Sequence, residues 1–180
     1  ADEWSDQEED DDEEKDEILN ALKKNNLLNK EEDKVKVVFY PIYLTGADGL
    51  LDLNYYESMQ GSHLGIFPSY YEPWGYTPLE AGALGVSSVT TDLAGFGRYI
   101  QKKENGKEGG IFVIKRYSKN DSEVIEQLAS VMYSFANLSN EERVKNKIKA
   151  HHLAAHADWN NLIKNYINAH NLALEKKFGK

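Results

Sequence analysis

FPSYYEPWGYTPLE (residues 67–80) begins at the end of the apolar run HLGIFP (residues 63–68). Its last residues read as the start of a helix. Thr77 is a favoured N-cap residue, Pro78 suits the first helical position, and Glu80 would complete a capping box. Gly75, just before them, lets the backbone pass close to a ligand. Free N–H groups at a helix N-terminus attract anions, so this turn predicts a site for phosphate.

Short apolar runs alternate with helical patterns on both sides of this turn. The predicted strands cover residues 34–40, 63–68, 87–91 and 109–116. The predicted helices cover residues 16–29, 54–61 (with Asn54 as N-cap), 78–84, 95–101, 121–137, 140–156 and 159–177. This alternation predicts an α/β fold, a doubly wound parallel sheet of four strands with C-terminal helices.

Three loops follow predicted strands, at residues 41–52, 68–77 and 92–97, and all are rich in Gly, Pro, Thr or Asp. In open parallel sheets, ligands bind at the carboxyl ends of the strands. These loops are therefore the candidate ligand-binding loops. Gly95 and Gly97 in the third loop fit either close approach to a ligand or a tight turn.

Composition excludes several classes of protein. The net charge of −9 is concentrated in residues 1–17, where Lys15 is the only base, so the rest of the chain is close to neutral. We therefore expect residues 1–17 to be an acidic, disordered lead-in, and we expect no nucleic-acid partner. No apolar run is long enough to span a bilayer, so we expect no membrane association. Cysteine is absent, which fits a reducing compartment, and we expect a cytoplasmic protein.

Two carboxylates, Glu72 and Glu80, lie in the opening stretch among aromatic side chains. Carboxylates bind vicinal hydroxyl groups well because each accepts from two donors. Glu80 has an alternative role in the capping box, whereas Glu72 has no evident structural role. A helix dipole supplies only about half a unit charge, less than a nucleotide diphosphate carries, so cationic groups must complete a phosphate site.

Residues 65–97, GIFPSYYEPWGYTPLEAGALGVSSVTTDLAGFG, closely resemble glycogen synthases of glycosyltransferase family 3, the animal and fungal type. The resemblance covers about residues 34–174, including LNYYESMQGSHLG upstream and the closing DWNNLIKNYINAHNLAL. It implies the Rossmann-like C-terminal domain of a GT-B glycosyltransferase over residues 18–180, with closing helices from about 138 to 180. Since the chain begins with Ala, we expect an excised piece of a longer protein.

The resemblance implies retaining transfer of glucose from UDP-glucose to the 4-hydroxyl at the non-reducing end of an α-1,4-glucan. Glu72 matches the glutamate beside the donor sugar, and Glu80 the one that binds the ribose hydroxyls. Tyr55 matches the tyrosine that stacks on uracil; its alternative role is packing on the sheet. The backbone of the matching segment meets the diphosphate and sugar: Trp74, Gly75, Tyr76 and Thr77.

The presence of Glu72 leaves two mechanisms open: a covalent glycosyl intermediate and front-face departure of the leaving group. Family members supply an arginine and a lysine for the diphosphate, and an acceptor-binding N-terminal domain, from earlier in the polypeptide. We therefore expect this piece to be inactive alone and to bind UDP weakly. The resemblance leaves open a homo-oligomer of the full-length protein.

The resemblance implies neither cofactor nor metal. His152 and His156 are four residues apart, but two solvated histidines are the simpler interpretation. The family's arginines that sense glucose 6-phosphate are matched here by Lys147, Lys149, His151 and His152, with no arginine, which disfavours that regulation. The alternatives are another retaining GT-B glycosyltransferase with a different donor or acceptor, and a non-catalytic glucan-associated domain. The intact glutamate pair argues against the latter.

Overall fold

The computed structural model describes residues 16–104 and 109–179. The chain divides into two compact units, Ala1–Tyr43 and Leu44–Lys180, and each is described by itself. In the first unit, the predicted N-terminal helix is confirmed as α2 (Glu17–Lys24). The carboxylate of Asp16 caps it by accepting hydrogen bonds from the backbone N–H groups of Ile18 and Leu19, at 2.8 and 3.0 Å. The helix is shorter than predicted because Asn26 adopts a left-handed conformation, with φ of 55°.

The predicted strand at residues 34–40 is wrong, because these residues form no regular structure. The side chain of Asn29 takes the place of a neighbouring strand. Its oxygen accepts from the backbone N–H of Val37 at 2.8 Å, and its NH₂ group donates to the carbonyl of Val37 at 2.6 Å. Val35 and Val38 are 58% and 77% exposed. A β-branched run becomes a strand only when another strand pairs with its backbone. The loop at residues 41–52 consequently follows no strand.

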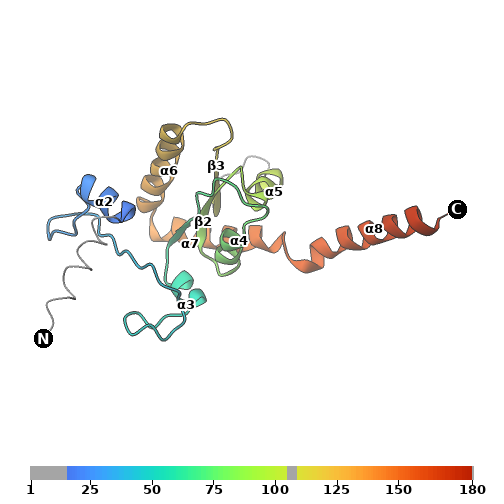
Figure 1. The fold of residues 1–180 in the computed structure, drawn as a ribbon, viewed down its shortest axis with the longest axis horizontal. Helices are drawn as coiled ribbons and strands as arrows, with labels where there is room; N and C mark the ends of the chain where they lie inside the picture. The colour runs from blue at the N-terminus through green and yellow to red at the C-terminus, as the bar shows by residue number, and fades with distance from the viewer. Residues whose placement is uncertain (1–15, 105–108, 180) are drawn as a thin grey trace, which may run out of the picture. The chain divides into compact units, whose positions relative to one another are not determined.

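The second unit contains a three-stranded parallel sheet: β1 (Leu64–Ile66), β2 (Ser87–Thr91) and β3 (Ile111–Ile114). The order is β1-β2-β3, with Leu64 opposite Ser87 and Val89 opposite Phe112. Every residue of the central strand β2 is buried. The prediction of a parallel sheet is thus confirmed, and among the described residues it has three strands in place of four (Figure 1).

The helices predicted in this unit are present. They are α3 (Tyr55–Gln60), α4 (Tyr76–Ala83), α5 (Gly95–Glu104), α6 (Asp121–Ala136), α7 (Asn140–Ala155) and α8 (Trp159–Phe178). Asn54 caps α3 in a reciprocal box with Glu57, as predicted for Asn54. Asn120 and Ser139 cap α6 and α7 in the same way, which satisfies backbone N–H groups that have no partner within the helix.

Helices cover both faces of the sheet. On one face, Val89 and Ile114 pack with Val124 of α6. On the other face, Ile111 packs with residues of α5 and α7, including Phe96 and Leu153. This arrangement confirms an α/β fold with a doubly wound parallel sheet. It places the loops after β1, β2 and β3 at one common edge.

The last helix, α8, contains no buried residue and follows α7 directly (Figure 1). Its N-cap is Asp158, whose carboxylate accepts from the backbone N–H of Asn160 at 2.7 Å. Within the described ranges, no helix has the length and apolar character required to cross a membrane.

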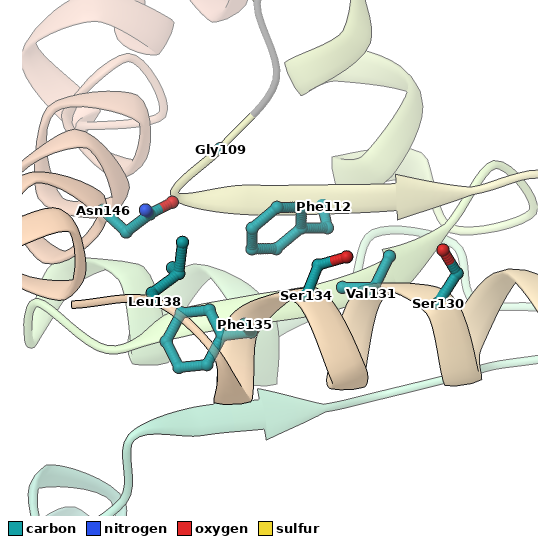
Figure 2. A pocket seen from close by; sticks show the side chains of 8 residues that line it. All are labelled: Gly109, Phe112, Ser130, Val131, Ser134, Phe135, Leu138 and Asn146. Carbon is teal, nitrogen blue, oxygen red and sulfur yellow. The ribbon is translucent and has the colours of Figure 1, made fainter.

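A cavity of about 320 Å³ lies between β3, α6 and α7 (Figure 2). The rings of Phe112 and Phe135 line it, with their centroids 6.3 Å apart. Asn146 of α7 closes one end, where its side-chain oxygen accepts from the N–H of Gly110 at 2.8 Å. Gly110 precedes β3, so the cavity lies at the amino end of that strand and away from the predicted ligand-binding edge.

Candidate functional site

Helix α4 begins two residues earlier than the sequence predicts. Gly75 is its N-cap, with φ of 105° and ψ of 78°, and no side chain caps the helix. The predicted capping box of Thr77 and Glu80 is therefore wrong. The left-handed turn at Gly75 brings Thr77 inside the first turn, where Pro78 is still tolerated because its missing N–H would have no helical partner. The carboxylate of Glu80 is consequently not used as a cap.

Glu72 is fixed through its backbone to the loop that follows β2. Its N–H donates to the carbonyl of Leu93 at 3.4 Å, and its own carbonyl accepts from the N–H of Gly95 at 3.1 Å. The hydroxyl of Ser69 donates to the Oε2 atom of Glu72 at 3.1 Å. That oxygen lies beside Gly75, 3.5 Å from where a Cβ atom on this glycine would be. The Glu72 carboxylate therefore lies at the start of α4, where the sequence predicts an anion site.

The two glycines of the third loop are explained by contacts within the protein. A Cβ atom on Gly95 would lie 2.2 Å from the carbonyl oxygen of Pro73, and one on Gly97 would lie 2.2 Å from that of Thr91. Backbone already fills both positions, so contacts within the protein, and not the approach of a ligand, explain these two glycines. The loops after β1 and β2 are held together by this packing.

Trp74 contributes its side chain to the core. Its ring packs at 5.7 Å from Phe96 and 5.5 Å from Tyr99, both on α5. Its carbonyl accepts from the N–H of Phe96 at 2.6 Å. Tyr76, the first residue of α4, is exposed. The structure thus separates Trp74, which packs inward, from Tyr76, which faces solvent.

Tyr55, Thr77 and Glu80 gather beside the first turn of α4. The Tyr55 hydroxyl donates to the Oε2 atom of Glu80 at 2.8 Å. Burial, and next the hydrogen bond to Glu80 with its negative charge, raise the pKa of Tyr55 from 10.0 to about 12. A hydrogen bond with Thr77 opposes this rise. The two residues that the resemblance assigns to the nucleoside, Tyr55 and Glu80, are therefore in direct contact.

A cavity of about 180 Å³ lies next to this contact. Tyr55 and Met59 of α3 line it together with Phe67 and Thr77. Its lining is mainly apolar, and Tyr55 presents an aromatic surface to it. A planar, partly apolar group suits such a space.

The arginine that follows β3, Arg116, is already paired with a carboxylate. Neither Glu72 nor Glu80 forms an ion pair with a lysine or arginine in the described ranges. Arg116, after β3, lies nearby, but its guanidinium pairs with Asp121 at 3.1 Å and is only 9% exposed. The cationic groups that a diphosphate requires are thus not supplied by Arg116.

Sequence reasoning missed three polar residues of this edge, namely Ser69, Asp92 and Arg116. Asp92 accepts hydrogen bonds from the backbone N–H groups of Arg116 and Tyr117, at 2.7 and 3.0 Å, and so joins the ends of β2 and β3. Ser69 and Asp92 lie in the loops that follow predicted strands, which is the signal that could have identified them. Arg116 falls inside the predicted strand 109–116, which extends beyond β3.

The histidines of α7 lie away from this edge. The Nδ1 atom of His151 is 2.9 Å from the carbonyl oxygen of Ala83, at the end of α4. His152 and His156 are exposed. Residues 16–104 and 109–179 contain no group of three or more His, Cys, Asp or Glu side chains placed to hold a metal ion.

Comparison with known proteins identifies the family of this chain. A family model described as glycogen synthase matches residues 8–180. Glycogen [starch] synthase of Caenorhabditis elegans is 44% identical over 160 residues, which are 88% of this chain and 24% of that protein. The Neurospora crassa protein of the same name is 38% identical, over 89% of this chain and 23% of the length of that protein. Isoform 1 of Saccharomyces cerevisiae is 40% identical, over 81% and 21% respectively.

The chain thus spans about a quarter or less of the length of these relatives, at 24%, 23% and 21%. The match to the family model, in contrast, extends over nearly all of the chain. The chain therefore belongs to the glycogen synthase family.

Proposed function

We propose that the full-length protein transfers glucose from UDP-glucose to the 4-hydroxyl at the non-reducing end of an α-1,4-glucan, with retention of configuration. The observation that carries this proposal is the gathering of Glu72, Tyr55 and Glu80 around the start of α4. Relatives that contain this segment bear the name glycogen [starch] synthase. The chain supplies the donor-binding half of the reaction, and the acceptor is bound elsewhere in the full-length protein.

The nucleoside half of the donor is assigned to Tyr55 and Glu80. The Tyr55 hydroxyl holds the Oε2 atom of Glu80, and no described residue bonds the Oε1 atom. That oxygen is available to accept from ribose hydroxyls, while the Tyr55 ring and the adjacent 180 Å³ cavity suit the uracil base. Replacing Tyr55 by Ala should weaken UDP binding by about tenfold or more, because base–aromatic stacking contributes about 1–3 kcal/mol.

The glucosyl half of the donor is assigned to Glu72. Its carboxylate is half-buried, and its Oε2 atom is held by the Ser69 hydroxyl. A carboxylate held beside the anomeric carbon stabilises the positive charge that develops there, either as a nucleophile or as a counter-charge during front-face departure. Both routes use the same placement of Glu72. The backbone of residues 74–77 faces the diphosphate in this assignment.

Additional positive charge must come from another part of the full-length protein. The first turn of α4 offers only about half a unit charge, and Arg116 is engaged by Asp121. We therefore propose that residues 1–180 alone bind UDP weakly and do not transfer glucose. The absence of a metal or other cofactor, the cytoplasmic location and a homo-oligomer stay predictions.

The test uses the full-length protein with radiolabelled UDP-glucose and glycogen. Wild type should incorporate label that an α-1,4-specific glucosidase releases, and Glu72→Ala should abolish incorporation with an unchanged unfolding temperature. Glu126→Ala, on the exposed side of α6, is the matched control and should retain activity. Transfer from another nucleotide sugar in preference to UDP-glucose, or normal turnover by Glu72→Ala, would overturn the proposal.

A further inference from the structure

We propose that Arg116 is a positioning residue for the Glu72 carboxylate, acting through Ser69. The inference rests on the proposed function of Glu72. The guanidinium lies where β3 ends and contacts the segment that contains Glu72, which we call the Glu72 loop (residues 67–75).

Arg116 contacts the Glu72 loop on both sides of Ser69. Its Nη1 atom donates to the carbonyl oxygen of Pro68 at 3.3 Å. The central carbon of its guanidinium lies 3.4 Å from the centroid of the Tyr70 ring. The residue before Ser69 and the residue after it are thus both held by one side chain, which is only 9% exposed.

Asp121 fixes the guanidinium in this position. Its Oδ1 atom accepts from the Nη2 atom of Arg116 at 3.1 Å and from the Tyr70 hydroxyl at 3.2 Å. Asp121 is the first residue of α6, where the helix N-terminus favours a negative charge. Arginine, tyrosine and aspartate therefore form a closed set of contacts, anchored on a helix that packs against the sheet.

Ser69 connects this set of contacts to Glu72. Its carbonyl accepts from the Thr91 hydroxyl at 2.9 Å, and its own hydroxyl donates to the Oε2 atom of Glu72 at 3.1 Å. Since Pro68 and Tyr70 are held by Arg116, Ser69 has little freedom to move its hydroxyl away from the carboxylate. Arg116 itself forms no ion pair with Glu72, so its effect must pass through Ser69.

The Arg116 side chain is not needed to hold the end of β3. The backbone N–H groups of Arg116 and Tyr117 already bond Asp92, at 2.7 and 3.0 Å, whatever side chain stands at position 116. The guanidinium makes contacts that only a planar, charged group can make together, because it donates in two directions and stacks on a ring. Lysine keeps the charge but cannot reproduce that geometry. The contacts of the Arg116 guanidinium therefore serve to hold the Glu72 loop in place.

The first experiment compares Arg116→Lys with wild type in the full-length protein. A misplacement of about 1 Å at a reacting group can cost about 100-fold in rate, so we expect kcat to fall by about 10- to 100-fold. The dissociation constant for UDP should change by less than about threefold, because Tyr55 and Glu80 make no contact with Arg116. Lys119→Met, which breaks the exposed Lys119–Glu123 pair close by, is the matched control and should change neither quantity.

A double-mutant cycle tests the route through Ser69. Ser69→Ala alone should lower kcat, and adding Arg116→Lys to it should lower kcat little further, because both changes remove the same constraint. Fully additive losses would overturn the proposal. So would an Arg116→Lys protein with a lower unfolding temperature and an unchanged kcat.

A measurement independent of activity separates this proposal from the proposed function. Amide hydrogen exchange in the full-length protein should become about tenfold faster in the Glu72 loop of Arg116→Lys, with α7 unchanged. Unchanged exchange in residues 67–75 would overturn the proposal. If wild type did not transfer glucose from UDP-glucose, the proposed function would fail, and the exchange result would still decide whether Arg116 holds the loop.

Discussion

The two carboxylates of the candidate site are held in different ways. Glu72 is tied through its backbone to Leu93 and Gly95, and its side chain is bonded by Ser69. Glu80 lies one turn into α4, and its carboxylate has a single hydrogen bond, from the hydroxyl of the exposed Tyr55. One carboxylate is thus fixed by two loops packed together, and the other, within the described ranges, by one contact between side chains.

This difference fits the two proposed roles. A group that stabilises charge at a reacting carbon must be in place before the reaction begins. A group that binds a nucleoside must instead accommodate a ligand that enters and leaves. The comparison therefore predicts that changes around Glu72 affect turnover and folding, whereas changes around Tyr55 and Glu80 affect nucleotide affinity.

The largest effect should come from the packing behind Glu72. In Gly95→Ala, the new methyl group would lie 2.2 Å from the Pro73 carbonyl, so the two loops would have to separate. We expect at least a 100-fold loss of turnover and a destabilisation of about 2–3 kcal/mol, measured by glucose incorporation and by chemical denaturation.

Gly85→Ala is the matched control for this variant. Gly85, unlike Gly95, has a positive φ, 74°, but nothing lies within 4 Å of its added Cβ atom. This control should lose only about 1 kcal/mol of stability, the cost of a left-handed conformation, and should keep its turnover. Equal effects at the two glycines would contradict the importance of the contact between the loops.

A smaller effect is expected from Trp74, whose ring packs on Phe96 and Tyr99. Trp74→Ala should destabilise the protein by about 3 kcal/mol, near the lower end for loss of a core aromatic side chain. Trp74→Phe should recover about half of that loss. Isothermal titration should show UDP affinity unchanged in Trp74→Phe, and a large loss of affinity would instead place this ring in the donor site.

The smallest effect concerns the titration of Tyr55. Its pKa is raised from 10.0 to about 12, so its protonated form contributes stability that is fully present below pH 10 and is lost as the pH rises toward 12. The tyrosinate absorbance of wild type minus that of Tyr55→Phe should therefore have a midpoint near 12.

Glu80→Gln removes the negative charge that contributes to this rise, so it should lower the midpoint while leaving it above the ordinary value, since burial persists. A difference titration centred at 10.0 in wild type would show that the contact between Tyr55 and Glu80 is not formed in solution.

Two β-branched segments show how far the fold could be predicted from the sequence. KVKVVFY, at residues 34–40, has the stronger strand pattern but forms no strand, because the side chain of Asn29 takes the backbone groups of Val37. SSVTT, at Ser87–Thr91, is more polar, yet it is the fully buried central strand β2 because strands pair with it on both sides. Alternation of elements predicted the α/β class, but pairing partners decide which runs become strands.

The candidate site shows a similar division. The motif placed Glu72, Gly75 and Glu80 near one helix start, and the structure agrees. The capping box failed because the sequence does not reveal that Gly75 turns into a left-handed conformation before Thr77. Arg116 was missed because its contacts with Pro68 and Asp121 depend on the order of strands in the sheet.

The most direct test of the account compares Glu72→Gln with Glu80→Gln in the full-length protein, measuring kcat at saturating UDP-glucose and the dissociation constant of UDP. Glu72→Gln should lower kcat by about 1,000-fold or more with UDP affinity nearly unchanged. Glu80→Gln should weaken UDP binding by about tenfold or more and lower kcat far less. Equal losses of kcat in the two variants, or the reverse assignment, would contradict the division of the site into a fixed catalytic carboxylate and an accessible nucleoside-binding one.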